Sequence, residues 1–240
     1  MNKDRPLDSL TKNDRIAWKV RRQLEVFPQK FRELEEGGQL SNLFRDPATF
    51  SGVRVEQAPE VFTEQYLIEP VLHGLGYLSA ASEEYERSGP HFIRQPITYR
   101  KVEPKQPDYL LKNVDPAIVC IVEAKAVNRE QMDGKKTHAT NDIREYIEEN
   151  TFCKFLRDLD QRYLAGIGTD GFRWTLWMKD LETGEIEEDS PKVDISSAIR
   201  KVASRRNVIE GEFSSGASDE REDLASEFVP AFASENLPSV

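Results

Sequence analysis

The feature that most constrains the fold is a run of apolar residues at 117–124, AIVCIVEA, near the middle of the chain. The run is continuous and rich in β-branched residues, which is typical of a strand buried on both faces of a sheet. Residues 113–116 have the composition of a turn and precede it. We therefore expect the run to form a central strand that other elements cover.

The other predicted elements surround this strand. Apolar residues at helical spacing predict helices at 13–34 (interrupted at Pro28), 59–77, 138–160 and 194–204. Branched and aromatic runs bounded by turn residues predict strands at 91–99, 106–111, 163–168 and 172–178. This order of elements indicates an α/β fold with a mixed central sheet flanked by helices.

The length allows one sizeable domain with appendages, since the chain has 240 residues. We expect an N-terminal helical region at 1–58, a core domain at 59–209 and a tail at 210–240. The tail is rich in Ser, Gly, Asp and Glu, and this composition predicts disorder.

The formal net charge of −10 argues, taken whole, against binding nucleic acid by bulk positive charge. The tail, however, holds eight acids and one base, so residues 1–209 carry only −3. A nearly neutral body can still meet a phosphate backbone through a local basic patch.

Other composition features suit an intracellular protein. Two cysteines cannot make a disulfide framework, which favours a reducing compartment. No apolar run reaches the roughly 18–20 residues that a membrane span needs, and the polar start does not look like a secretory signal. We expect a cytoplasmic protein that does not bind a membrane.

Acidic and basic residues follow the central strand directly. Glu123 and Lys125 are two residues apart, so in a strand they project to the same side. If the strand at 106–111 pairs with it, Asp108 converges with Glu123. Two carboxylates beside a lysine suit Mg²⁺, which prefers oxygen ligands, and the lysine can stabilise negative charge as it develops. This pattern indicates metal-assisted phosphodiester hydrolysis.

Glu64 is a further candidate. It lies at helical spacing from Ile68, Val71 and Leu75, on the stripe that faces the core. An unpaired carboxylate is unfavourable there, so we expect either a metal or a basic partner.

Together these residues resemble a known family. Glu64, Pro107-Asp108 and Glu123-Ala124-Lys125 resemble the PD-(D/E)xK nuclease superfamily, the fold of many restriction endonucleases. The phrases TEQYLIEPVLHGLGY and AGIGTDGFRWTLW resemble the amino-terminal nuclease domain of the motor subunit of type I restriction enzymes. The likeness covers roughly residues 60–180.

The resemblance implies a restriction-endonuclease-like core and a role for each matching residue. Asp108 and Glu123 would be catalytic metal ligands, Lys125 the catalytic lysine, and Glu64 an accessory metal ligand. The cofactor would be Mg²⁺, with Mn²⁺ as a substitute, and the substrate would be DNA. One position departs from the pattern, because Asp142 stands where related nucleases often carry Gln four residues before a Tyr, here Tyr146.

Several residues have competing interpretations. Asp142 and Tyr146 also fit a solvated helix face and a packing ring. Arg129, Lys135 and Lys136 are either phosphate contacts or part of a solvated loop. The GxGxxG string at 166–171 precedes a strand-like sequence rather than a helix, so it predicts a turn between strands and not a dinucleotide site.

Two functions follow from these observations. The first is a Mg²⁺-dependent DNA endonuclease in a restriction or related prokaryotic or viral defence system, acting as a homodimer or with other subunits of a restriction complex. The second is a non-catalytic DNA-binding or assembly module on the same fold that acts through a partner. The tail, with its apolar patch at 228–232, would recruit that partner, shield a basic face, or only solubilise the chain.

Overall fold

The computed structural model describes residues 10–25, 59–96, 106–127, 139–187, 191–205 and 224–237. Its centre is a six-stranded mixed sheet in the order β1-β2-β3-β4-β5-β6, in which only β3 and β4 are parallel. The strands are β1 (His91–Arg94), β2 (Tyr109–Lys112), β3 (Ile118–Ala124), β4 (Tyr163–Thr169), β5 (Arg173–Asp180) and β6 (Lys192–Asp194). Helices accompany this sheet, so the predicted α/β class is confirmed.

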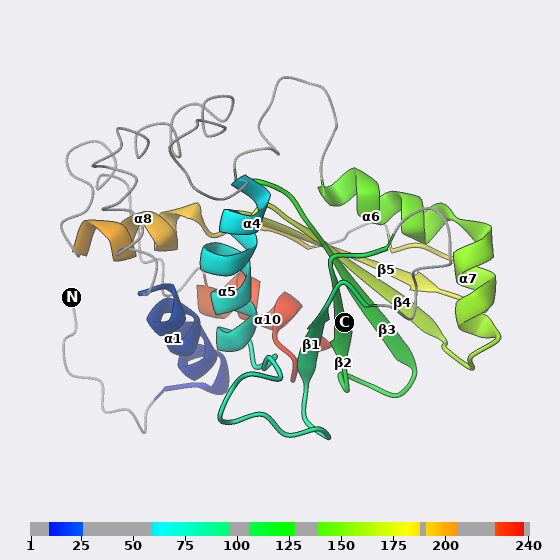
Figure 1. Cartoon of the computed structure of the whole chain (residues 1–240), viewed down its shortest axis with the longest axis horizontal. Coiled ribbons are helices and arrows are strands. Elements are labelled where there is room, and N and C mark those ends of the chain that lie inside the picture. The colour runs from blue at the N-terminus through cyan, green and yellow to red at the C-terminus, as the bar shows by residue number, and fades with distance from the viewer. Residues whose placement is uncertain are drawn as a thin grey trace.

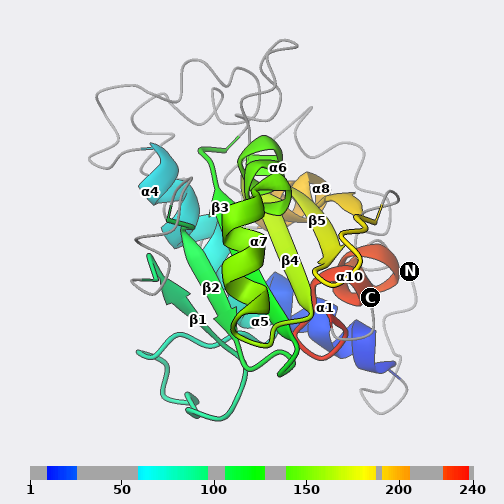
Figure 2. The same cartoon turned by 90° about the vertical axis from the view of Figure 1, so that its right-hand side faces the viewer.

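The sheet lies between two layers of helices (Figures 1 and 2). One face is covered by α6 (Ala139–Glu148) and α7 (Asn150–Arg157), which connect β3 to its parallel neighbour β4. The other face is covered by α1 (Lys12–Leu24), α4 (Pro59–Thr63), η3 (Glu64–Ile68), α5 (Glu69–Gly74), α8 (Ser196–Arg205), η7 (Leu224–Phe228) and α10 (Val229–Phe232).

Strand β3 has the central, buried position that its sequence predicts. Cys120 and Val122 belong to the core beneath α1 and α5, whereas Val119 and Ile121 belong to the core beneath α6 and α7. This alternation is the period of two of a strand. Because both faces are covered, every position of the strand after the first is buried.

The predicted helix at 59–77 forms as three joined segments, with a π-helical turn at η3 between α4 and α5. Pro70 lies in the first turn of α5 and has no backbone N–H to donate to the preceding turn. The wider turn includes a hydrogen bond from the Glu69 N–H to the Glu64 carbonyl. The helix therefore continues past Pro70 with a shifted hydrogen-bond pattern rather than ending there.

Helix α1 packs on α5 through a close backbone approach. Thr11 caps α1 in a reciprocal capping box with Asp14. Gly74, at the end of α5, lies against the backbone of Val20, and a Cβ at that position would collide with it. The N-terminal helix thus belongs to the same hydrophobic core as the sheet.

The expectation of a disordered tail is wrong for residues 224–237. Leu224, Phe228 and Phe232 are buried, and the Phe228 ring lies 5.4 Å from that of Trp174 on β5. The Ser234 N–H donates to the Leu75 carbonyl at 3.0 Å. These apolar residues recur every four positions along a helix, so burial against the sheet outweighs the acidic composition of the segment.

Candidate metal centre

The β2–β3 pair brings two of the predicted acids together. Tyr109 pairs with Val122, so Asp108 and Glu123 lie one position beyond the paired residues at the same end of the sheet. The Ala124 N–H donates to Asp108 Oδ2 at 2.7 Å, which fixes the Asp108 carboxylate against β3. Glu123 is 4% exposed. The convergence expected of these two carboxylates is therefore present.

Lys125 lies beside Glu123 as the period of two predicts. Its Nζ is 3.4 Å from Glu123 Oε1 and 2.9 Å from Asp142 Oδ2, on α6. Burial by itself would lower the pKa of Lys125, but the hydrogen bond to Asp142 and the negative charge of Glu123 outweigh it and raise the pKa. Lys125 is therefore held as an ammonium between the carboxyl groups of Glu123 and Asp142.

Electrostatic strain is concentrated in the two converging acids. Burial raises the pKa of Glu123 from 4.5 to about 8, and the charge of Asp108 adds to the increase. Burial likewise raises the pKa of Asp108, from 3.8 to about 6, against the hydrogen bond from Ala124. In the part of the chain that the structure describes, buried Glu123 Oε2 has no hydrogen-bond partner. An added cation would relieve both the repulsion and the unsatisfied oxygen.

Glu64 has the basic partner that was one of its two predicted alternatives. It is 8% exposed, and its Oε2 accepts from Arg94 Nη2 at 2.6 Å and from the Tyr109 hydroxyl at 2.9 Å. Arg94 also reaches Glu69 Oε1 at 3.3 Å. The charge of the Glu64 carboxylate is therefore compensated by Arg94. Glu123 differs, because its Oε2 atom has no hydrogen-bond partner among the described residues.

Glu60 is a site residue that the sequence analysis missed. One carboxylate oxygen from each of Glu60, Glu64 and Asp108 lies within 4.8 Å of the others, a group that could hold a metal ion. Glu60 is one turn before Glu64 on the same helical run, and this spacing of four was a usable signal. Glu123 is not a member of this group but lies beside Asp108 at the end of the β2–β3 pair. All four groups are carboxyl groups, whose oxygens hard divalent cations prefer.

Helix α6 contributes more to the site than its sequence suggested. The expectation of a solvated face is wrong for Asp142, because its side chain is only 18% exposed and pairs with Lys125. Tyr146 is a buried packing ring, 5.6 Å from Phe152, as expected. Its hydroxyl is buried and has no partner among the residues that the structure describes. Figures 1 and 2 show α4 and α6 at the same end of the sheet, on opposite faces.

Two further predictions concern a basic segment and a glycine-rich string. Arg129, Lys135 and Lys136 fall outside the described ranges. The GxGxxG string forms the end of β4 and its turn into antiparallel β5, with Gly171 at a φ of 82°, so the predicted strand-to-strand turn is confirmed.

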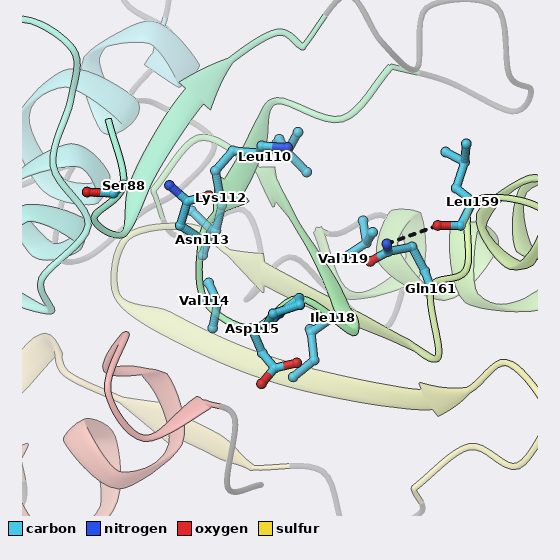
Figure 3. Close-up of a pocket in the computed structure, with 12 residues that line it drawn as sticks. Ser88, Leu110, Lys112, Asn113, Val114, Asp115, Ile118, Val119, Leu159 and Gln161 are labelled. Carbon is cyan, nitrogen blue, oxygen red and sulfur yellow. Dashed lines mark hydrogen bonds between the residues drawn. The ribbon is translucent and has the colours of Figure 1, made fainter. Parts of the chain in front are cut away.

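A separate hollow of about 590 Å³ lies at the opposite end of β3 (Figure 3). Its walls include Lys112, Asp115, Ile118, Leu159 and Gln161, and none of the acids of the metal centre. Asp115 is engaged in the turn before β3, where its Oδ1 accepts from the Ala117 N–H at 2.7 Å. The carboxylate cluster is thus a separate feature from this hollow.

Comparisons with protein-family models, curated proteins and solved structures found no match. Among the described helices, none is long and apolar enough to cross a membrane.

Proposed function

We propose that this chain is a Mg²⁺-dependent DNA endonuclease with a restriction-endonuclease-like core, acting in a restriction or related defence system. One observation carries the proposal: a buried carboxylate with an unsatisfied oxygen, Glu123, lies next to Asp108 and Lys125 at the end of a paired strand. Perturbed titratable groups of this kind gather at functional sites. The order of Glu64, Asp108, Glu123 and Lys125 and their resemblance to PD-(D/E)xK nucleases supply the reaction class.

In this proposal each residue has a separate task. Asp108 and Glu123 hold the cation, and Glu60 and Glu64 extend the carboxylate group on the α4 side. The bound cation would polarise a phosphoryl oxygen and lower the pKa of a coordinated water. Lys125, held as an ammonium, stabilises the negative charge that develops on the phosphate.

The charge of the site supports a cation requirement. Among the described residues, two bases face this end of the sheet, Arg94 and Lys125. Six acids lie with them: Glu60, Glu64, Glu69, Asp108, Glu123 and Asp142. Because acids outnumber bases among these described residues, a divalent cation between the acids and a phosphodiester would reduce their repulsion.

Helix α1 offers a surface for nucleic acid. Arg15, Trp18, Lys19 and Arg22 are exposed at i, i+3, i+4 and i+7, which places them on one face of the helix. Trp18 is 46% exposed, and the Arg22 guanidinium lies 5.2 Å from the centre of its ring. Cationic side chains beside an exposed aromatic ring suit a phosphate backbone with an adjacent base.

The proposal is tested by incubating the protein with plasmid, linear duplex and single-stranded DNA in Mg²⁺, Mn²⁺ or EDTA. We expect cleavage with either metal and none in EDTA. Asp108→Ala, Glu123→Ala and Lys125→Ala should each abolish cleavage while the protein remains folded. Lys112→Ala, which removes an exposed lysine from neighbouring β2, is the matched control and should cut normally. Undiminished nicking by Lys125→Ala would refute the assignment.

The alternative function, a non-catalytic module that acts through a partner, loses one of its supports. The apolar patch at 228–232 that would recruit a partner is buried in the core of the chain itself. DNA binding without cleavage under all three conditions would favour this alternative.

A further inference from the structure

We propose that Asp142 is a positioning residue: it holds the Lys125 ammonium closer to itself than to Glu123 and thereby leaves Glu123 more available to a divalent cation. The inference rests on the proposed function only in taking Glu123 as a cation ligand. It assigns to Asp142 a role in setting the strength of cation binding, not a role as a ligand.

Two carboxylates share the Lys125 ammonium unequally. The Nζ atom is 2.9 Å from Asp142 Oδ2 and 3.4 Å from Glu123 Oε1, so the shorter contact is with α6 rather than with its own strand. An ammonium group and a divalent cation compete for the same Glu123 carboxylate because they have the same sign of charge. Whatever keeps the ammonium on Asp142 therefore favours the cation on Glu123.

Helix α6 is a firm support for this contact. Ile143, Tyr146 and Ile147 are buried against the sheet, and they place Asp142 in the first turn of the helix, next to the end of β3. At the other end of α6, Lys179 Nζ from β5 donates to the Ile147 carbonyl at 2.6 Å. A helix fixed at both its face and its end holds Asp142 in one place.

The two oxygens of Glu123 have different surroundings, which leaves one of them open to a cation. Lys125 contacts Oε1, whereas Oε2 is buried without a partner in the described structure. If Asp142 lost its charge, Glu123 would remain as the ion-pair partner of Lys125 among the described residues, and the ammonium would move onto Glu123. The acidic group that could hold a metal comprises Glu60, Glu64 and Asp108 and includes neither Glu123 nor Asp142. Glu123 enters the proposal as the buried residue beside Asp108 at the end of the β2–β3 pair.

The test is calorimetric titration of the full-length protein with Mn²⁺ in the absence of DNA. Asp142→Asn should raise the Mn²⁺ dissociation constant about tenfold, which is within the range of coupling between charged neighbours. Asp142→Glu, which retains the charge, should restore binding to within about threefold of the wild type. Glu145→Gln removes an exposed acid from the same helix and should change binding by less than about twofold.

The decisive comparison is in a Lys125→Met background. If Asp142 acts by holding Lys125, then adding Asp142→Asn to Lys125→Met should change Mn²⁺ binding by less than about threefold. An equal loss in both backgrounds would show that Asp142 acts on the cation directly, and no loss in either would show that it has no role; both results overturn the proposal. Thermal unfolding monitored by circular dichroism checks that each variant is folded.

The result also separates this proposal from the nuclease function. Lysine-dependent coupling in a protein that cleaves no DNA supports the role of Asp142 and refutes the endonuclease. Normal cleavage by the wild type, with no coupling between Asp142 and Lys125, supports the endonuclease and refutes the role of Asp142. A wild-type protein that binds no Mn²⁺ overturns both the positioning role and the metal centre.

Discussion

Replacing Glu123 with Gln should stabilise the metal-free protein, and increasingly so as the pH rises. Burial and the charge of Asp108 raise the pKa of Glu123 from 4.5 to about 8. Between these values the folded protein keeps a proton on Glu123 that the unfolded chain has released, so stability falls as the pH rises through this window. Gln is neutral at every pH and is free of this loss.

The magnitude follows from the size of the shift. A rise from 4.5 to about 8 corresponds to about 5 kcal/mol at about 1.36 kcal/mol per pKa unit. Asp108, whose pKa is raised to about 6, shares the same repulsion, so the two costs do not add. We therefore expect Glu123→Gln to gain about 2–4 kcal/mol over the wild type on going from about pH 5 to about pH 8.5.

The assay is urea unfolding of both proteins in EDTA across this pH range. Burial lowers the pKa of His73, and the contribution of this residue therefore makes stability rise with pH. Because both proteins contain His73, its contribution cancels when their free energies of unfolding are subtracted. Excess Mg²⁺ should stabilise the wild type and not the variant, because a ligand that binds only the folded state shifts the equilibrium towards it. A difference in stability that does not change with pH would refute the electrostatic reasoning.

Three further predictions concern the fold and the proposed DNA surface on α1. Phe228→Ala should lower the free energy of unfolding in urea by about 3–5 kcal/mol, since the ring is fully buried; a loss below about 1 kcal/mol would contradict the placement of the C-terminal segment in the core. Gly74→Ala should cost about 1–3 kcal/mol despite the better helix propensity of Ala, because its Cβ meets the Val20 backbone, and a raised melting temperature would contradict this contact. Lys19→Glu combined with Arg22→Glu should weaken DNA binding and reduce its dependence on salt by about one unit of slope per lost phosphate contact, and unchanged affinity at low salt would exclude α1 as a DNA surface.

Much of the sheet could be predicted because its strands have strong local signals. The apolar run at 117–124 has no competing interpretation, and the turn residues before it and at 169–171 define strand ends. The same local periodicity places Glu123 and Lys125 on one side. The convergence of Asp108 with Glu123 required one further assumption, the pairing of adjacent strands, which is the common arrangement.

The elements that were missed depend on long-range packing. Strand β6 has only three residues and is defined by its pairing with β5 rather than by its own sequence. The C-terminal segment carries buried apolar residues every four positions, but it directly follows a stretch rich in Ser, Gly and acids at 210–223, and the composition of the whole tail obscures this short periodicity. Its partners, such as Trp174 and Leu75, lie far away in sequence, and no local pattern identifies them.

The same limit explains which carboxylates remain uncompensated at the metal centre. The sequence alone allowed either a metal or a basic side chain as the partner of Glu64. In the structure the partner is Arg94, thirty residues further along the chain. Likewise, Asp142 on α6 pairs with the ammonium group of Lys125. With these pairs formed, Asp108 and Glu123 are the acids of the site whose pKa values are raised most, chiefly by burial. The tertiary pairing of the other acids, rather than the number of acids in the sequence, therefore singles out Asp108 and Glu123 as the two acids that a cation would stabilise most.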